Sequence, residues 1–143
     1  MSDIIPEETS TSDVQAPLHS RQAEEAVLGA VLIDSEAYFT VSQFLKADDF
    51  YIVRNRWIWE AFTRLHEKRS PIDYLTVTQD LEQQSQMDEI GGQAYLLTLI
   101  NQTPSSLNVD AYAHLVEEHS LRRRILAAAN ELAQLAYDQK QTI

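Results

Sequence analysis

The stretch NVDAYAHLVEEHSLRRRILAAANELAQLAYDQK, residues 108–140, decides the fold. It contains neither glycine nor proline, so a single helix of roughly 30 residues can run through it, nearly three times the length of a typical globular helix. Five apolar residues in its second half are spaced by four, three, four and three positions, which is the spacing of a coiled-coil seam. They are Leu121, Ile125, Ala128, Leu132 and Leu135. The sequence therefore predicts a long helix with an apolar face for another helix.

Three consecutive arginines, Arg122, Arg123 and Arg124, interrupt this apolar pattern. Successive helical positions differ by about 100°, so the three side chains spread over about 200° and cannot form one basic patch. At least one must lie beside the seam, where we expect ion pairs between subunits. The sequence ends at Ile143 without a second helix to cover the seam. We therefore expect the long helix to be the first arm of a truncated helical hairpin.

Residues 18–107 are expected to form a compact head of about five helices, which makes the fold class all-α. Apolar residues at helical spacing predict helices at about 21–33, 35–45, 55–68, 74–84 and 92–101. Ser20, Asp34 and Asp73 can cap three of these helices. Gly29 weakens the first helix by about 1 kcal/mol relative to alanine, and close packing against a neighbouring helix is the expected reason. Residues 1–17 predict a disordered acidic tail, and residues 108–143 the long helix.

The composition excludes several classes of function. The net charge is −11, and affinity for nucleic acid comes mainly from Lys and Arg neutralising phosphates, so the chain is a poor candidate for holding DNA alone. Without cysteine, it has no thiolate nucleophile or thiolate metal site. Glycines stand only at positions 29, 91 and 92, which cannot form a phosphate-binding loop. No apolar run approaches the ~18 residues of a membrane span. We expect a soluble chain with no catalytic site, cofactor or membrane partner.

Two clusters of side chains could indicate other chemistry. His114 and Glu118 are four residues apart on the long helix, a spacing that can hold zinc, but His119 is five residues from His114 and lies elsewhere around the helix. Asp48 and Asp49 are adjacent carboxylates in an expected turn, where Asp commonly forms local hydrogen bonds. We expect these residues to be structural and the chain to have no metal site.

A third cluster is typical of a binder of single-stranded DNA. Aromatic and basic residues alternate between positions 54 and 64, a pattern that can stack bases and neutralise phosphates. The residues are Arg54, Arg56, Trp57, Trp59, Phe62 and Arg64. On a single helix, however, Trp59 and Phe62 most simply belong to the core. A stand-alone module that binds single-stranded DNA stays open as an alternative function.

Several segments, in the same order along the chain, resemble those of DnaB-type replicative DNA helicases. They are HSRQAEEAVLGAVL at 19–32, ADDFY at 47–51, IWEAF at 58–62, PID at 71–73, TV at 76–77, GGQAYL at 91–96 and TPSSLNVDAYA at 103–113. The resemblance extends from about residue 18 to residue 137. It departs from the family at the first turn, where Arg21 or Gln22 stands in place of a common glutamate. It also stops before the family's second hairpin helix, linker helix and RecA-like ATPase domain.

The resemblance implies the N-terminal domain of a hexameric helicase that acts in DNA replication and the primosome. In the family this domain forms a collar built as a trimer of dimers and receives a DnaG-type primase and, in many bacteria, a helicase loader. ATP and Mg²⁺ would bind in the missing C-terminal domain, through which DNA would mainly be contacted. A cytoplasmic location is implied, in bacteria or in a plastid. The helicase-binding domain of a primase, which resembles this fold, stays open as a second alternative.

Overall fold

The computed structural model describes residues 19–140 and residue 142. Its elements are α2 (Arg21–Ile33), α3 (Glu36–Val41), the 3-10 helix η1 (Ala47–Asp49), α4 (Val53–Glu67), α5 (Tyr74–Gln83), α6 (Gly92–Gln102) and α7 (Val109–Tyr137). No strand occurs in this part of the chain, and the all-α prediction is confirmed. The acidic tail predicted at residues 1–17 lies outside the described residues.

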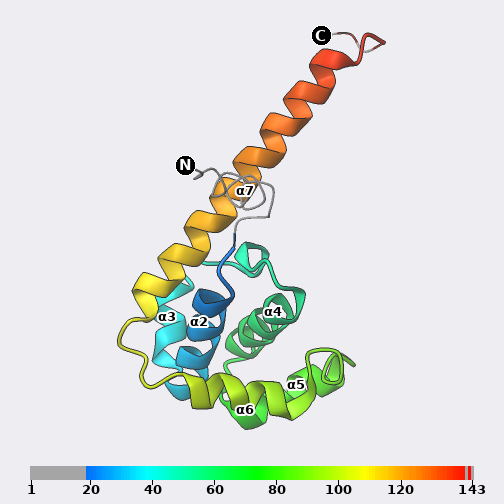
Figure 1. The fold of residues 1–143 in the computed structure, drawn as a ribbon. Helices are drawn as coiled ribbons and strands as arrows, with labels where there is room; N and C mark the ends of the chain where they lie inside the picture. The colour runs from blue at the N-terminus through cyan, green and yellow to red at the C-terminus, as the bar shows by residue number, and fades with distance from the viewer. Residues whose placement is uncertain (1–18, 141, 143) are drawn as a thin grey trace, which may run out of the picture.

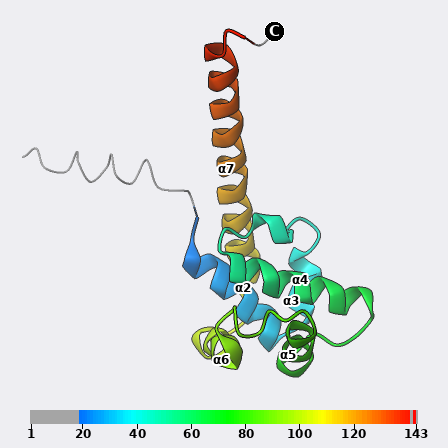
Figure 2. The ribbon, with the colours of Figure 1, turned by 90° about the vertical axis from the view of Figure 1, so that its right-hand side faces the viewer.

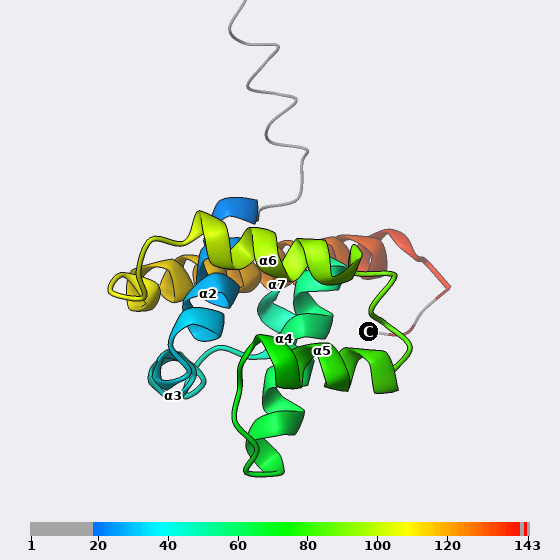
Figure 3. The same ribbon diagram turned by 90° about the horizontal axis from the view of Figure 1, so that it is seen from below.

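Helices α2 to α6 and η1 gather around one end of α7 and form the head (Figures 1 and 2). Within the head, α5 packs on α4 and α6 packs on α2. Figure 3 views the molecule from below and shows α5 and α6 in front, at the end of the head opposite to the free end of α7. The long helix therefore projects away from the body of the protein.

The first helix follows its predicted start and its predicted close packing. The Ser20 hydroxyl accepts a hydrogen bond from the Ala23 N–H at 3.1 Å, which caps α2. A Cβ atom on Gly29 would lie 2.5 Å from the carbonyl oxygen of Leu99 and 2.1 Å from Oγ1 of Thr103. Only glycine lets α2 and α6 approach this closely, so the prediction for Gly29 is confirmed.

The second helix is shorter than the sequence indicates. The prediction of a helix over 35–45 is wrong at its C-terminal end, because α3 stops at Val41. Val41, Phe44 and Leu45 would share one face of a continuous helix. Instead the chain turns, so that Leu45 enters the core at 1% exposure and the ring of Phe44 stacks on His114 of α7 with 4.1 Å between ring centroids. The regular helix therefore ends where two neighbouring side chains have different surroundings.

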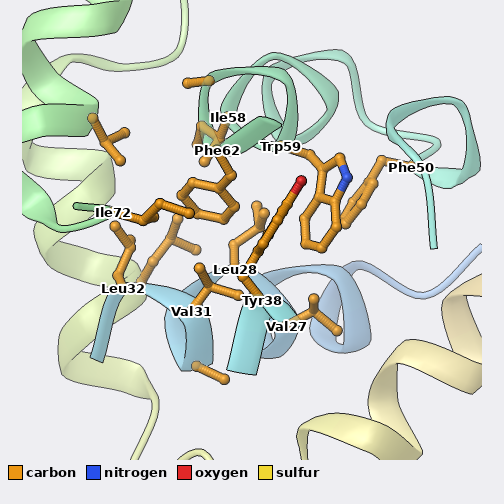
Figure 4. Close-up of a cluster of buried hydrophobic side chains, with 14 of the residues drawn as sticks. Val27, Leu28, Val31, Leu32, Tyr38, Phe50, Ile58, Trp59, Phe62 and Ile72 are labelled. Carbon is orange, nitrogen blue, oxygen red and sulfur yellow. The ribbon is translucent and has the colours of Figure 1, made fainter. Parts of the chain in front are cut away.

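An aromatic cluster fills the core between α2, α3 and α4 (Figure 4). The ring of Tyr38 lies between Phe62 and Trp59, with centroid distances of 6.4 and 5.1 Å. Phe50, from the segment after η1, lies 5.4 Å from Trp59. All four side chains are buried. Trp59 and Phe62 thus belong to the core, and the prediction made for them from the sequence is confirmed.

The first half of α7 is part of the same packed unit. Val109, Ala113, Val116 and Ser120 are buried, and their spacing of four, three and four residues places them on one face of the helix. This face packs against α2, α3 and η1. No helix among residues 19–140 is long and apolar enough to cross a membrane.

Candidate assembly surface on the long helix

The predicted seam lies on the exposed half of α7. Leu121, Ile125, Leu132 and Leu135 are 49%, 57%, 68% and 38% exposed, and Ala128 is exposed as well. Four large apolar side chains in one row on a solvated helix are an unfavourable arrangement for a chain in isolation. The seam as a contact between helices stays a prediction, since the structure describes one chain.

The seam lies to one side of the face that packs on the head. At about 100° per residue, the seam is centred about 110° around the helix from the face that carries Ala113 and Ser120. A second apolar row, Leu126, Ala129, Ala133 and Ala136, is centred about 150° from that face in the other direction. The side that continues the head-facing face carries polar residues instead, among them Glu131 and Gln134. A partner helix can therefore approach α7 without meeting the head of the chain to which α7 belongs.

The side of α7 that carries the seam is polar in the first turns of the helix. His114 lies between two carboxylates, 3.6 Å from an oxygen of Asp110 and 3.5 Å from an oxygen of Glu117. Arg122 pairs with Glu118 at 3.3 Å. The apolar surface thus begins at Leu121 and continues to Ala136, a length of about 22 Å at 1.5 Å per residue. We call the seam together with the second apolar row, Leu126, Ala129, Ala133 and Ala136, the assembly face.

The three consecutive arginines have three different environments. Arg122 forms the pair with Glu118 within its own helix. Arg123 turns toward the head, where Nη2 donates to the carbonyl oxygen of Asp49 at 3.0 Å, and burial lowers the pKa of its guanidinium. Arg124 is exposed. Arg122 and Arg124 flank the seam on its two sides, about 100° and 60° from its centre, and the ion pairs between subunits stay a prediction.

The candidate metal ligands do not converge. His114 faces Asp110 and Glu117 and stacks on Phe44, which leaves Glu118 to Arg122. Within the described part of the chain, no group of three or more His, Cys, Asp or Glu side chains is arranged to hold a metal ion. Asp49 is buried and accepts hydrogen bonds from the Lys46 N–H and the Ser120 hydroxyl. The adjacent Asp48 is exposed, so the two carboxylates have different surroundings.

The arginines of the candidate DNA-binding helix are all engaged by the head. The Arg54 guanidinium lies 3.8 Å from the ring centroid of Tyr95. Arg56 donates to the carbonyl oxygen of Phe50 at 3.1 Å, and Arg64 pairs with Asp80 at 2.6 Å. Trp57 is half-buried and packs against the core. These side chains form no open row of cations beside exposed aromatic rings.

The sequence patterns missed a buried polar network around Glu24. Its carboxylate is 1% exposed and accepts hydrogen bonds from the Tyr51 N–H at 2.7 Å, the Ile52 N–H at 3.3 Å and Nδ2 of Asn55 at 3.0 Å. The Tyr95 hydroxyl donates to Oδ1 of Asn55. The sign in the sequence is that Glu24 shares the apolar face of its helix, one turn before residues 27 and 28. A charge at such a position predicts internal partners.

The match to a known family covers both the head and the start of α7. Residues 16–118 match the family described as the DnaB-like helicase N terminal domain. The chain belongs to this family. The replicative DNA helicase DnaB of Haemophilus influenzae is 37% identical to this DnaB-like domain over 130 residues, which are 91% of the chain. DnaB of a Nostoc species is 43% identical over 122 residues, or 85% of the chain, and DnaB of Geobacillus stearothermophilus 39% identical over 127 residues, or 89%.

The DnaB-like domain spans only 28%, 14% and 28% of the full length of these three relatives. Among solved structures, the N-terminal domain of DnaB helicase from Mycobacterium tuberculosis is similar to it with a TM-score of 0.85 and 31% identity, covering 90% of this chain and 91% of that one. The N-terminal domain of DnaB helicase from Helicobacter pylori, in a structure described with its interactions with primase, has the same fold, with a TM-score of 0.69 and 22% identity, over 95% and 99% of the two chains. The expected all-α DnaB fold is thereby confirmed.

Proposed function

We propose that this DnaB N-terminal domain is a non-catalytic assembly module that also docks primase or a helicase loader. Its parent protein would be the hexameric, ATP-dependent replicative helicase of DNA replication, with ATP and Mg²⁺ bound in another domain. The observation that carries the proposal is the assembly face of α7, an apolar surface on a helix that projects from the head. Helical arms that cover this face would join subunits in pairs, and three pairs would form the hexamer.

The exposed areas set the scale of this association. Full burial of a Leu or Ile side chain contributes about 1.5–3 kcal/mol, and the four large seam residues are each already about half buried. Burying the remainder on two copies therefore contributes about 6–12 kcal/mol. Association costs about 4–15 kcal/mol in lost translational and rotational freedom. The two terms nearly cancel, so we expect this chain alone to be a monomer or a weak dimer, and stable pairing to need the complete hairpin.

The docking role is supported by the surface of the head and by charge. Phe39 and Leu75 are 53% and 63% exposed on the head, which offers apolar contacts to a protein partner. The net charge of −11 opposes nucleic acid as the main partner, and the arginines of α4 already have partners within the head. The Helicobacter pylori domain, which shares the fold, is described with its interactions with primase. Together these observations favour a protein partner over single-stranded DNA.

A binding assay tests the docking role. The helicase-binding C-terminal domain of a DnaG-type primase is titrated into the chain extended through its hairpin, and the heat of binding is measured. We expect saturable binding that survives 0.2 M salt. Absence of binding to both the extended and the present chain would remove primase docking from the proposal.

A second titration, with labelled single-stranded DNA at low salt, tests the alternative function. We expect no anisotropy change. Salt-dependent DNA binding that is lost in the Arg54→Ala and Trp57→Ala variants would support the single-strand binder instead.

A further inference from the structure

The segment between α3 and α4 connects the long helix to the core of the head. Asp49, in η1, is 8% exposed, and its two carboxylate oxygens have different partners. Oδ2 accepts the Lys46 N–H at 2.9 Å, which closes the 3-10 turn. Oδ1 accepts the hydroxyl of Ser120 at 2.7 Å, across 71 residues of chain. One carboxylate thus holds its own loop and α7 together.

Arg123 adds two contacts to the same loop from the next turn of α7. Its Nη2 donates to the carbonyl oxygen of Asp49 at 3.0 Å, and its guanidinium lies 5.2 Å from the ring centroid of Tyr51, within the range of a cation–π interaction. Ser120 and Arg123 are three residues apart, so they are neighbours on one side of the helix. Two neighbouring side chains of α7 therefore contact the same short loop.

The loop itself is fixed to the core. Phe50 is fully buried and packs on Trp59. The Tyr51 N–H donates to the buried Glu24 carboxylate at 2.7 Å, and Arg56 donates to the Phe50 carbonyl oxygen. A contact made by α7 to this loop is thus a contact to the rigid part of the head.

These contacts lie at the point where α7 leaves the head. Every described residue from 124 to 140 is exposed, so Ser120 and Arg123 are the last α7 side chains that are held. The free part of the helix, from Arg123 to Tyr137, is about 21 Å long at 1.5 Å per residue. A tilt of about 20° at this point would displace its end by about 7 Å.

We propose that Asp49, Ser120 and Arg123 form a latch that sets the direction in which α7 leaves the head. They are positioning residues, and the latch determines where the head lies relative to the assembly face. This role rests on the proposed function. The direction of α7 itself is a property of the single chain and is measurable without any partner.

The test is a distance measurement by pulsed electron paramagnetic resonance. The chain contains no cysteine, so the exposed positions Glu82 on α5 and Gln134 on α7 can be changed to cysteine and spin-labelled selectively. An excess of unlabelled chain removes distances between molecules. We expect one narrow distance distribution with the latch intact. In the Ser120→Ala, Arg123→Ala double variant we expect a distribution broadened or shifted by several ångström, and in Arg123→Lys a smaller change.

A matched control separates the latch from general stability. Asp80→Asn weakens a buried ion pair between α4 and α5 that does not touch α7, so it should lower the melting temperature and leave the distance distribution unchanged. An unchanged distribution in the folded double variant would overturn the latch. If circular dichroism shows that the double variant does not fold, the distance distribution of the single variant Ser120→Ala is measured instead, and an unchanged distribution there overturns the latch. Failure of the chain extended through its hairpin to bind primase and to associate would refute the proposed function and leave this result standing.

Discussion

Replacing Gly29 with alanine should destabilise the domain, although replacing glycine with alanine inside most helices stabilises the helix. Alanine in a helix interior is usually favoured over glycine by about 1 kcal/mol. Here the added Cβ would lie 2.1 Å from Oγ1 of Thr103 and 2.5 Å from the carbonyl oxygen of Leu99. The hydroxyl can rotate away with its side chain. The carbonyl belongs to the backbone of α6, so relief requires α2 and α6 to move apart.

The magnitude follows from these two opposing terms. Overpacking of a well-packed site costs about 1–3 kcal/mol, and a clash with backbone belongs at the upper end of that range. Subtracting about 1 kcal/mol for the gain in helix propensity leaves a net loss of about 2 kcal/mol. For a domain of this size the loss corresponds to a melting temperature lower by about 8 °C.

The assay is thermal and urea unfolding followed by circular dichroism at 222 nm. Thr103→Ala alone and the double variant Gly29→Ala, Thr103→Ala are measured in parallel. Because the Leu99 carbonyl remains in the double variant, removing the threonine hydroxyl should recover only part of the stability that Gly29→Ala loses. A Gly29→Ala variant at least as stable as the parent chain would refute the close contact between α2 and α6.

Two further predictions concern the buried polar groups. Asp80→Asn should lower the free energy of unfolding by about 2 kcal/mol, since Asp80 is buried and the amide accepts from Arg64 through one oxygen only and without a charge; a loss below about 0.5 kcal/mol in urea titrations would contradict this. Burial raises the pKa of Tyr95 from 10.0 to about 12. The contribution of this pKa shift to stability should therefore be complete below pH 10 and be lost between pH 10 and 12. Ultraviolet titration should show one of the six tyrosines ionising in a separate step after the others, and this late step should be absent in the Tyr95→Phe variant.

The sequence predicted most helices because their apolar residues recur at the helical period and their ends carry capping residues. Asp73 is an example, since its side chain and that of Thr76 cap the start of α5 reciprocally. The end of α3 could not be predicted in this way. Phe44 and Leu45 keep the helical spacing from Val41, but Phe44 stacks on His114 of α7 and Leu45 lies in the core, and local periodicity carries no information about these contacts.

The same limit applies to the candidate site. The seam from Leu121 to Leu135 follows from spacing alone, and so did the conclusion that three successive arginines must diverge. Which arginine faces the head depends on Asp49, more than 70 residues away in the sequence, and periodicity carries no information about that contact. The buried role of Glu24 likewise depends on the N–H groups of Tyr51 and Ile52 and on Asn55 in the first turn of α4, which lie 27 to 31 residues away in the sequence.

The central claim is that the assembly face of α7 joins subunits, and the mass of the protein in solution tests it most directly. The measurement is light scattering during gel filtration of the chain extended through its complete hairpin, with Leu132→Asp and the control Gln134→Asp, which lies away from the seam. We expect a dimer or larger assembly for the parent and for Gln134→Asp, and a monomer for Leu132→Asp, because a carboxylate in the seam would be buried without a partner. An unchanged mass for Leu132→Asp, with its helix content intact, would contradict the claim.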